Sequence, residues 1–399
     1  MKKILSILVC SILFVSSCTK GDENNEGPSE VQINESISSF SFKSLKALSK
    51  EEENTLFSPL SLHTALTMTT MGASTHSLDN LRSFLDLDNW SKEDISESYK
   101  ILLEKFDLSN NDTTSLNCKN QFFYDVSRIS LYQEFSDLVK NGFDHGELIL
   151  DFNDPDAINK VNQWAAESTN DRIKEIIKEI EDTEILFIVN ATYFIGDWSL
   201  GFHPDQTIDD IFYGPGEVEY DVKMMSSDEI RMSYADSKFS AVDLPFKGKE
   251  YAMTFIVPQN TPHQFISLEE SLNSWYTDLL DNKLTEQRTY VRLPRFELAT
   301  KYKLNDVFKE MGLTEIWKGK ADFSSLGTSP LGPLYVSRIL HDAFIKVDEK
   351  GVEGAAVTVV GIAADSAPPQ IIFNKPFFFV IRHVETQTPI FVGVFNTPE

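Results

Sequence analysis

The chain has 399 residues, of which 41% are hydrophobic, and its formal net charge is −25. It contains 29 phenylalanines, so it carries enough apolar material for a large core. Acidic residues outnumber basic ones by 61 to 36 and are spread along the chain, with no basic stripe that could face phosphates. Composition therefore argues against a nucleic-acid-binding protein.

The N-terminus has the pattern of an export signal. Two lysines precede an apolar run over residues 4–15, which is too short to span a bilayer. The run ends in Val15-Ser16-Ser17-Cys18, which resembles a bacterial lipoprotein cleavage box. The pattern predicts a signal peptide over residues 1–17 and lipidation of Cys18, and plain secretion with an incidental cysteine is the alternative.

The segment after this cysteine is predicted to be a flexible tether over residues 18–32, because it is polar, acidic and contains Gly and Pro. An acidic stretch just after a lipidated cysteine resembles the surface-export signals of some Gram-negative lipoproteins. We therefore expect a membrane partner through the lipid anchor. The domain would be held at the outer membrane and exposed at the cell surface.

Helices are predicted mainly in the first half of the chain. Apolar residues recur at helical spacing, Ser58 is a plausible N-cap before Pro59, and Ser91 begins a further helix. The predicted helices cover residues 33–49, 58–71, 91–106 and 156–180.

Strands are predicted mainly in the second half. Residues 185–194 form a nearly continuous apolar run, which is typical of a central strand covered on both faces. The other predicted strands cover residues 116–126, 239–244, 251–257, 288–293, 334–347, 377–382 and 390–395. Early helices and late strands, with no second linker and no repeat, predict one α+β domain over residues 33–399.

Motifs of catalysis and metal binding are missing from the sequence. It has no Gly-x-Ser-x-Gly, no His-Glu-x-x-His, no Cys-x-x-Cys and no phosphate-binding glycine loop. Its seven histidines never fall three or four residues apart, so no metal pair forms on one helix face. We predict a protein that is not an enzyme and binds no metal or cofactor, although a triad assembled from distant residues stays open.

The segment over residues 347–360 combines two opposite local preferences. Small residues at its start suit a bend, whereas residues 357–360 are β-branched and favour a strand. No proline occurs between Phe344 and Ala367, so every backbone N–H there can be donated to a sheet. The pattern predicts a loop that can become a strand, and an ordinary edge strand with a glycine bend is the alternative.

Six ordered motifs resemble those of the serpin family. They are Asn54-Thr55-Leu56-Phe57-Ser58-Pro59-Leu60-Ser61-Leu62, Asn190-Ala191-Thr192-Tyr193-Phe194-Ile195-Gly196-Asp197-Trp198, Val222-Lys223-Met224-Met225, Leu293-Pro294-Arg295-Phe296, Ala321-Asp322-Phe323-Ser324, and a closing set from His341-Asp342-Ala343-Phe344 through Phe373-Asn374-Lys375-Pro376-Phe377 to Pro389-Ile390-Phe391-Val392-Gly393. The resemblance implies a serpin fold, with three β-sheets, eight or nine helices and an exposed reactive-centre loop.

The resemblance also implies a mechanism, that of a suicide-substrate inhibitor of serine proteases, or of cysteine proteases. After cleavage the loop inserts as a strand into the central sheet and traps the acyl-enzyme. The implied loop hinge comprises Glu349, Gly351, Val352, Glu353, Gly354, Ala355 and Ala356. One face of the inserted strand would carry no charge, which permits burial. The alternative is a non-inhibitory serpin that acts as a surface binding or carrier protein.

The family's spacing implies the position of the bond that is cut. The scissile bond follows the seventeenth residue counted from the hinge glutamate, Glu349, which gives Asp365–Ser366. Because few proteases prefer Asp before the cut, Ala364–Asp365 is an equal competitor. Small residues before Ala364 favour elastase-like or subtilisin-like target proteases, and Asp-directed proteases come second.

Two further clusters match the family residue by residue. Ser58, Ser61, Asn190 and His341 match the polar network that governs opening of the sheet. Trp198, Thr207, Arg295 and Glu349 match the region where the loop first enters. Arg295 opposite Glu349 would form a partly buried ion pair.

The resemblance also bears on partners. Some relatives bind sulfated polysaccharides through a basic helix, but here residues 91–106 carry at least as many acids as bases. We therefore expect no heparin-like polyanion as a partner, and we expect a monomer.

Overall fold

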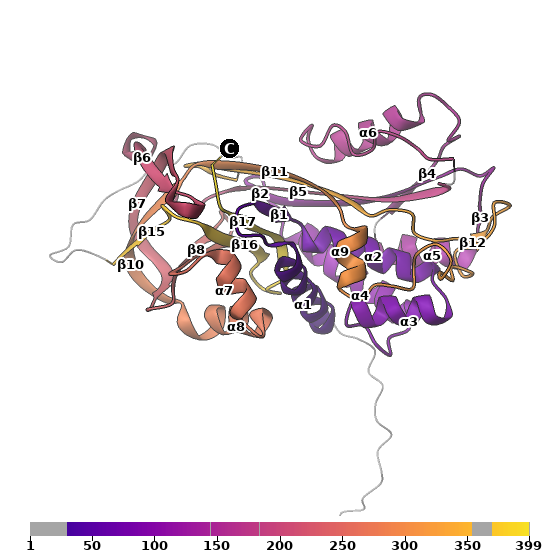
Figure 1. Ribbon diagram of the computed structural model, residues 1–399, viewed down its shortest axis with the longest axis horizontal. Coiled ribbons are helices and arrows are strands. Elements are labelled where there is room, and N and C mark those ends of the chain that lie inside the picture. Colours follow the sequence, from indigo (N-terminus) through magenta and orange to yellow (C-terminus); the bar gives the residue numbers. More distant parts are fainter. Residues whose placement is uncertain (1–29, 144, 183, 353–368, 399) are drawn as a thin grey trace, which may run out of the picture.

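The computed structural model describes residues 30–143, 145–182, 184–352 and 369–398 (Figure 1). The part of the chain so described contains nine α-helices and three short helical turns. The helices are α1 (Glu30–Leu48), α2 (Pro59–Gly72), α3 (Thr75–Phe84), α4 (Lys92–Leu108), α5 (Gln133–Phe143), α6 (Ala157–Ser168), α7 (Pro262–Leu268), α8 (Leu272–Asp278) and α9 (Asn305–Glu310). The turns are η1 (Pro204–Gln206), η2 (Pro215–Glu217) and η3 (Leu279–Lys283).

Three sheets are found within the described residues. A nine-stranded sheet has the order β1-β17-β16-β9-β8-β7-β10-β15, with β6 paired to β7. Its strands are β1 (Thr55–Phe57), β6 (Ile208–Tyr213), β7 (Glu219–Ala235), β8 (Phe239–Pro245), β9 (Tyr251–Pro258), β10 (Thr285–Pro294), β15 (Gln370–Ile372), β16 (Phe377–His383) and β17 (Pro389–Phe395).

The second sheet has six strands in the order β11-β13-β14-β5-β2-β4, and the third pairs β12 with β3. The strands of the six-stranded sheet are β2 (Thr114–Tyr124), β4 (His145–Ile149), β5 (Leu186–Asp197), β11 (Phe296–Lys303), β13 (Leu340–Val347) and β14 (Gly351–Val352). Those of the small sheet are β3 (Ser130–Leu131) and β12 (Gly327–Thr328). Three sheets and nine helices confirm the predicted α+β fold.

The six-stranded sheet is covered on both faces (Figure 1). Helix α2 packs beneath it, and most residues of α2 are buried. Ser58 caps this helix by accepting the Ser61 N–H, and Pro59 takes the first helical position, as the sequence predicts. On the outer face α6 buries an apolar cluster that includes Phe123, Val161 and Val189. The centre of this sheet therefore lies between two helical layers.

The predicted helix over residues 156–180 is wrong in its second half. Helix α6 ends at Ser168, and Asn170 and Asp171 then have φ of 50° and 62°, which an α-helix does not tolerate. The segment that follows binds the middle of α6 through Asn162, whose Oδ1 accepts the N–H groups of Ile176 and Ile177. The Asn162 side chain thus accepts the two N–H groups that carbonyl oxygens would accept in a continuing helix.

The predicted strand over residues 334–347 is too long, because β13 begins only at Leu340. Backbone donors before it are used elsewhere: Val336 N–H donates to Ile316 O, and Ile339 N–H donates to Asn305 Oδ1. The sequence does not predict strands β3, β4, β6, β7, β11, β12 and β15 or helices α3, α5, α7, α8 and α9, because they are short or carry many polar residues. Within the described residues, no helix combines the length and hydropathy that crossing a bilayer requires.

Candidate functional site

The hinge predicted from sequence lies inside the six-stranded sheet. After β13 the chain turns at residues 348–350 and returns as β14, with Val347 opposite Val352. On its other side β14 pairs with β5, where Gly351 lies opposite Asp197 and Val352 opposite Gly196. Val352 is 2% exposed, so its side chain is already part of the core. Gly351 and Val352, the first hinge residues that form a strand, thus lie between β13 and β5.

Gly351 occupies a position that no other residue type fits. Its φ is 153°, and a Cβ built there would lie 1.9 Å from the Gly196 carbonyl oxygen. Such a contact is far below any van der Waals distance, so β14 can approach β5 only because Gly351 has no side chain. The neighbouring glycine is also required, since a Cβ on Gly196 would lie 2.7 Å from the Phe246 ring.

Glu349 anchors the turn through its buried carboxylate. Arg295 Nε donates to Glu349 Oε1 at 2.6 Å, and the Thr207 hydroxyl donates to the same oxygen. The backbone carbonyl of Glu349 accepts the Phe202 N–H at 2.9 Å. Burial acts to raise the pKa of Glu349, but the bonds from Arg295 and Thr207 outweigh it, so the pKa lies below its ordinary value. The carboxylate is therefore held ionised.

Trp198 holds the same turn from the side of β5. Its indole Nε1 donates to Asp348 O at 3.0 Å, and its backbone N–H donates to Lys350 O at 2.7 Å. The indole is fully buried and stacks on Phe246 with ring centroids 4.6 Å apart. The structure thus brings together, at one turn, the four residues expected where the loop enters: Trp198, Thr207, Arg295 and Glu349.

The second predicted cluster lies further along β13. Ser58 N–H donates to His341 Nε2 at 2.9 Å, and Ser58 Oγ donates to Ile390 O at 2.8 Å. Ser61 joins the cluster through its backbone N–H, which donates to Ser58 Oγ. Asn190 lies on β5, and its side chain is outside the described set. The imidazole of His341 thereby connects the six-stranded sheet to the start of α2.

An apolar cavity of about 180 Å³ lies near this cluster, between the beginning of β5 and the beginning of β13. Its lining includes Leu62 and Leu66 of α2, Leu186 of β5, and Ile339 and Leu340. No ladder joins β13 directly to β5 anywhere in the described part of the chain. The two strands are bridged only by β14 at one end, and the cavity lies towards the other end.

Several predicted site residues lie outside the described residues. They are Cys18, Glu353, Gly354, Ala355, Ala356, Ala364, Asp365 and Ser366. Conversely, sequence reasoning assigned no role to Gly196, Phe202 or Phe246, which the structure brings to the turn. Gly196 could have been found from sequence, because a glycine within a strand indicates close backbone approach. No local pattern in the sequence predicts the contacts of Phe202 and Phe246.

These features define an α+β protein in which the chain after β13 turns back and forms a short strand between β13 and β5. Within the described residues, no group of three or more His, Cys, Asp or Glu side chains could hold a metal ion. The polar groups of the site bind one another and backbone atoms of the hinge and of neighbouring strands.

Comparison with known proteins identifies the family. The family model described as "Serpin (serine protease inhibitor)" matches residues 35–398. Serpin B3 from Homo sapiens is 30% identical over 92% of this chain and 99% of its own length, and neuroserpin from Gallus gallus is 28% identical over 88% and 87%. The crystal structure of tengpin, a thermophilic serpin in the native state, has a TM-score of 0.84 at 27% identity, covering 92% of this chain and 94% of tengpin. This chain belongs to the serpin family.

We predict that Gly351→Ala releases β14 from β5. The added methyl cannot fit beside the Gly196 carbonyl, so the Trp198 N–H loses Lys350 O as its acceptor. Hydrogen exchange at the Trp198 amide should become at least about tenfold faster, because its protection depends on this local pairing. Gly332→Ala is the matched control, since Gly332 also has a positive φ of 108° but has open space around it. Equal exchange in both variants would contradict the steric account.

We predict a loss of stability in mild acid from two buried histidines. Burial lowers the pKa of His341 to about 4 and that of His63 to about 3, from the ordinary 6.5. Both stay neutral in the folded protein, whereas the unfolded chain binds their protons below about pH 6.5. Stability is therefore complete above about pH 6.5 and falls as the pH drops towards 4, by up to ~1.4 kcal/mol per pH unit for each histidine.

Urea unfolding at pH values between 5 and 8 measures this dependence. His341→Gln keeps an acceptor for the Ser58 N–H but cannot be protonated. It should reduce the slope by roughly half while leaving stability at pH 8 close to that of the wild type. A slope that this variant leaves unchanged would show that His341 does not titrate on unfolding.

Proposed function

We propose that this serpin is a suicide-substrate inhibitor of serine or cysteine proteases and has no enzymatic activity of its own. A target protease cleaves the reactive-centre loop, the loop inserts between β13 and β5, and the acylated protease is carried with it and inactivated. Its relatives include proteins named as serine protease inhibitors from rat and mouse. The observation that carries the proposal is the position of β14, since the hinge already lies where the inserted strand would begin.

The register of β14 supports insertion of the residues that follow. Continued at the same register, Ala356 would face Ala343 of β13, and Thr358 would face His341. On the β5 side, Thr358 would face Asn190. Val352 points inward and is buried, so residues 354, 356, 358 and 360 would point inward too. This face is Gly, Ala, Thr and Val, and its burial leaves no charge without a partner.

The apolar cavity fits the far end of the same strand. At the continued register, Val360 would lie beside Ile339, which lines the cavity. Filling an apolar hollow with a β-branched side chain recovers van der Waals contacts that its lining lacks. The inward face of the loop and the cavity are thus complementary in chemistry.

A direct test is incubation with pancreatic elastase or subtilisin, followed by denaturing gel electrophoresis. An inhibitor leaves a covalent complex that survives denaturation, whereas a binding or carrier protein is only cleaved. Human thyroxine-binding globulin, a serpin crystallised with thyroxine, has a TM-score of 0.81 to this chain at 20% identity, which shows a shared fold alone. Cleavage without any covalent complex would favour the carrier alternative.

We predict that Val352→Arg converts the protein from inhibitor to substrate. Val352 is buried, and a guanidinium there would lack a partner at a cost of several kcal/mol. The stoichiometry of inhibition, which is the moles of inhibitor consumed per mole of protease inactivated, should rise well above one. Val352→Ala, which removes apolar atoms without adding charge, is the matched control and should stay close to wild type. Calorimetry should also show that cleavage raises the melting temperature of the wild type but not of the Arg variant.

The proposed targets follow from residues 361–364, which are Gly-Ile-Ala-Ala, and from Asp365. An elastase-like or subtilisin-like protease with a small apolar pocket would accept Ala364 before the cut. An Asp-directed protease would accept Asp365 and cut before Ser366. These two bonds remain the competing sites of cleavage.

We predict no efficient trapping of trypsin, because no Lys or Arg lies between Gly351 and Asn374. Mass spectrometry of the released C-terminal peptide distinguishes the competing bonds. A peptide that begins at Asp365 supports elastase-like targets, and one that begins at Ser366 supports Asp-directed targets. Rapid covalent trapping of trypsin would refute both assignments.

We further propose a monomer that is anchored to the outer membrane by lipid on Cys18 and exposed at the cell surface. Metabolic labelling with a palmitate analogue should mark the wild type, and Cys18→Ser should remove both the label and the membrane association. An unlabelled, released wild type would instead support plain secretion.

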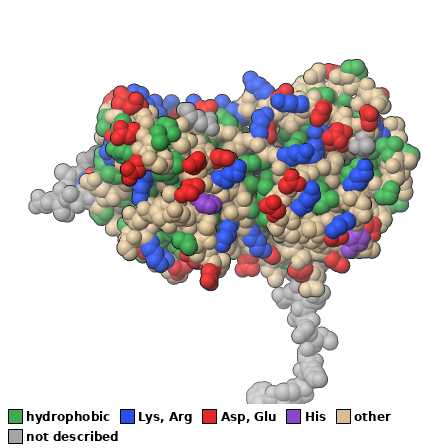
Figure 2. Space-filling view, in the orientation of Figure 1, with side chains coloured by type: hydrophobic (Ala, Val, Ile, Leu, Met, Phe, Trp, Pro, Cys, Tyr) green, Lys and Arg blue, Asp and Glu red, His purple; other side chains and the backbone are tan. Residues whose placement is uncertain are grey.

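A heparin-like cofactor is not part of the proposal. The bases of α4 alternate with acids, and Lys100 pairs with Glu97 while Lys105 pairs with Glu385. Figure 2 shows basic and acidic side chains interspersed over the visible face of the molecule. A polyanion would therefore meet carboxylates beside each lysine of this helix.

A further inference from the structure

Two arginines and one buried glutamate lie at the end of the six-stranded sheet that is far from the hinge. Glu184 comes just before β5, and its side chain is 1% exposed. Arg338 comes just before β13, with its Nε 2.7 Å from Glu184 Oε1, and its Nη2 donates to Glu184 Oε2 at 2.9 Å. Arg128 Nη1 donates to the Glu184 carbonyl oxygen at 2.9 Å. We call Arg128, Glu184 and Arg338 the basal clamp.

The basal clamp is fixed by the segments around it. Arg338 Nη2 also donates to Glu179 O at 2.7 Å, in the segment that follows α6. Arg128 Nη2 donates to Asn153 Oδ1 at 3.0 Å. The Ser329 hydroxyl donates to Arg128 O at 2.7 Å, beside β3 and β12 and so at the opposite end of the molecule from β6 (Figure 1). Segments that are distant in sequence thus meet at the clamp.

The ion pair of the clamp crosses the gap between β13 and β5. Ile185 and Leu186 line the apolar cavity from the side of β5, and Ser337 and Arg338 line it from the side of β13. Within the described residues, β14 joins the two strands at one end of this gap, and the contact between Arg338 and Glu184 joins the segments just before them at the other. The cavity lies between these two connections.

A full inserted strand would have to open the clamp. Neighbouring strands lie about 4.8 Å apart, so a strand between β13 and β5 would hold them about 10 Å apart. At the register of β14, Gly361 would lie beside Arg338. On the other side, Ala364 would lie beside Glu184. The ion pair spans the space that this stretch of the loop would fill, and parting it leaves a buried carboxylate without its guanidinium, which is costly.

We propose that the basal clamp controls the last step of loop insertion. This inference rests on the proposed function. Residues 353–360 would enter without disturbing the clamp, because Val360 reaches only as far as Ile339. Residues 361–364 would enter only after the ion pair has parted. The clamp would therefore delay complete insertion of an uncleaved loop, which keeps the inhibitor in its active form.

Two synthetic peptides test this control without any protease. One has the sequence of residues 353–360 and ends before the clamp, and the other has the sequence of residues 353–364 and passes it. The full chain is incubated with each fluorescein-labelled peptide, and size-exclusion chromatography measures the rate of stable incorporation. In the wild type the short peptide should enter at least about tenfold faster, because the long one must part a buried ion pair. Glu184→Gln, which keeps the shape of the side chain but removes its charge, should bring the two rates close together.

A double variant separates the ion pair from a general loss of stability. Arg338→Met keeps an unbranched stem and removes the guanidinium. If the pair acts as a unit, the double variant Glu184→Gln/Arg338→Met should take up the long peptide no faster than the faster single variant. Effects that add would mean that the two residues act separately, which would overturn the proposal.

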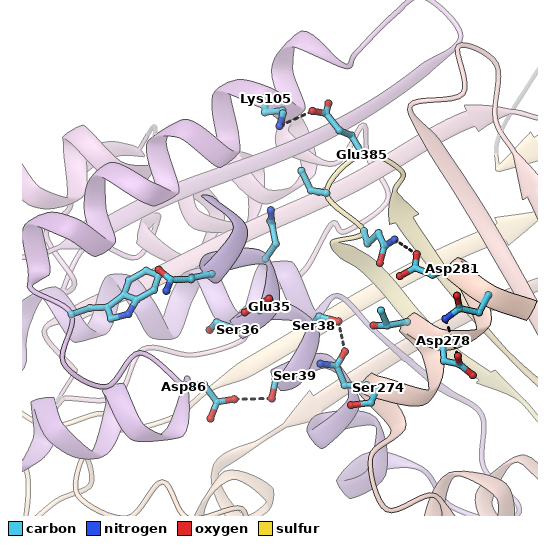
Figure 3. Close-up of a pocket in the computed structure, with 18 residues that line it drawn as sticks. Glu35, Ser36, Ser38, Ser39, Asp86, Lys105, Ser274, Asp278, Asp281 and Glu385 are labelled. Carbon is cyan, nitrogen blue, oxygen red and sulfur yellow. Dashed lines mark hydrogen bonds and ion pairs between the residues drawn. The ribbon is translucent and has the colours of Figure 1, made fainter. Parts of the chain in front are cut away.

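Glu385→Gln is the matched control. Glu385 pairs with Lys105 at 2.9 Å at the edge of a groove on the helical side of the molecule (Figure 3). This ion pair also joins distant segments, but the described residues that line the groove belong to elements other than β5 and β13. The control should keep the wild-type ratio of the two rates. On prolonged incubation, Glu184→Gln should lose its protease-trapping activity faster than Glu385→Gln does.

The outcomes distinguish this inference from the proposed function. Equal rates for the two peptides in the wild type, or a ratio that Glu184→Gln leaves unchanged, would overturn the role of the clamp and leave the inhibitory mechanism intact. If neither peptide enters the wild type, insertion itself is refuted, and both the inference and the proposed function are lost.

Discussion

The close approach of β14 to β5 is the constraint on which the rest of the site depends. Two glycines permit this contact, because a Cβ on Gly351 would meet the Gly196 carbonyl and a Cβ on Gly196 would meet the Phe246 ring. Only with both side chains absent can the turn before β14 come close enough for Trp198 to bind Asp348 O and Lys350 O. The ion pair of Glu349 with Arg295 then closes the same turn from the opposite side. The polar contacts of the turn therefore depend on the space that the two glycines leave.

The two ends of the six-stranded sheet differ as a result of this arrangement. At one end β13 and β5 are bridged by β14 and held by buried polar contacts, whereas towards the other end an apolar cavity lies between them. His341 lines this cavity and ties β13 to the start of α2 through Ser58. Because its imidazole is buried and neutral, this tie depends on pH in a way that the glycine contact does not.

Much of the fold could be predicted from sequence, for reasons that particular elements make clear. Strands β9, β16 and β17 are buried at every residue, so their apolar runs are unmistakable. In contrast, β7 mixes exposed and buried positions over 17 residues, and its polar residues conceal it. Within the site, the resemblance named Glu349 and Arg295, which the structure brings together. Phe202 and Phe246 act through a backbone N–H and a stacked ring, whose partners are distant in sequence, so no local pattern encodes these contacts.

The start of α1 has a consequence for where the proposed inhibitor can operate. Helix α1 begins at Glu30, so with Cys18 as the proposed anchor only residues 18–29 precede the helix. Even fully extended, a segment of this length reaches ~40 Å. With this proposed anchor, the serpin domain would stay within a thin shell above the lipid headgroups, and only proteases that reach that shell could meet its loop.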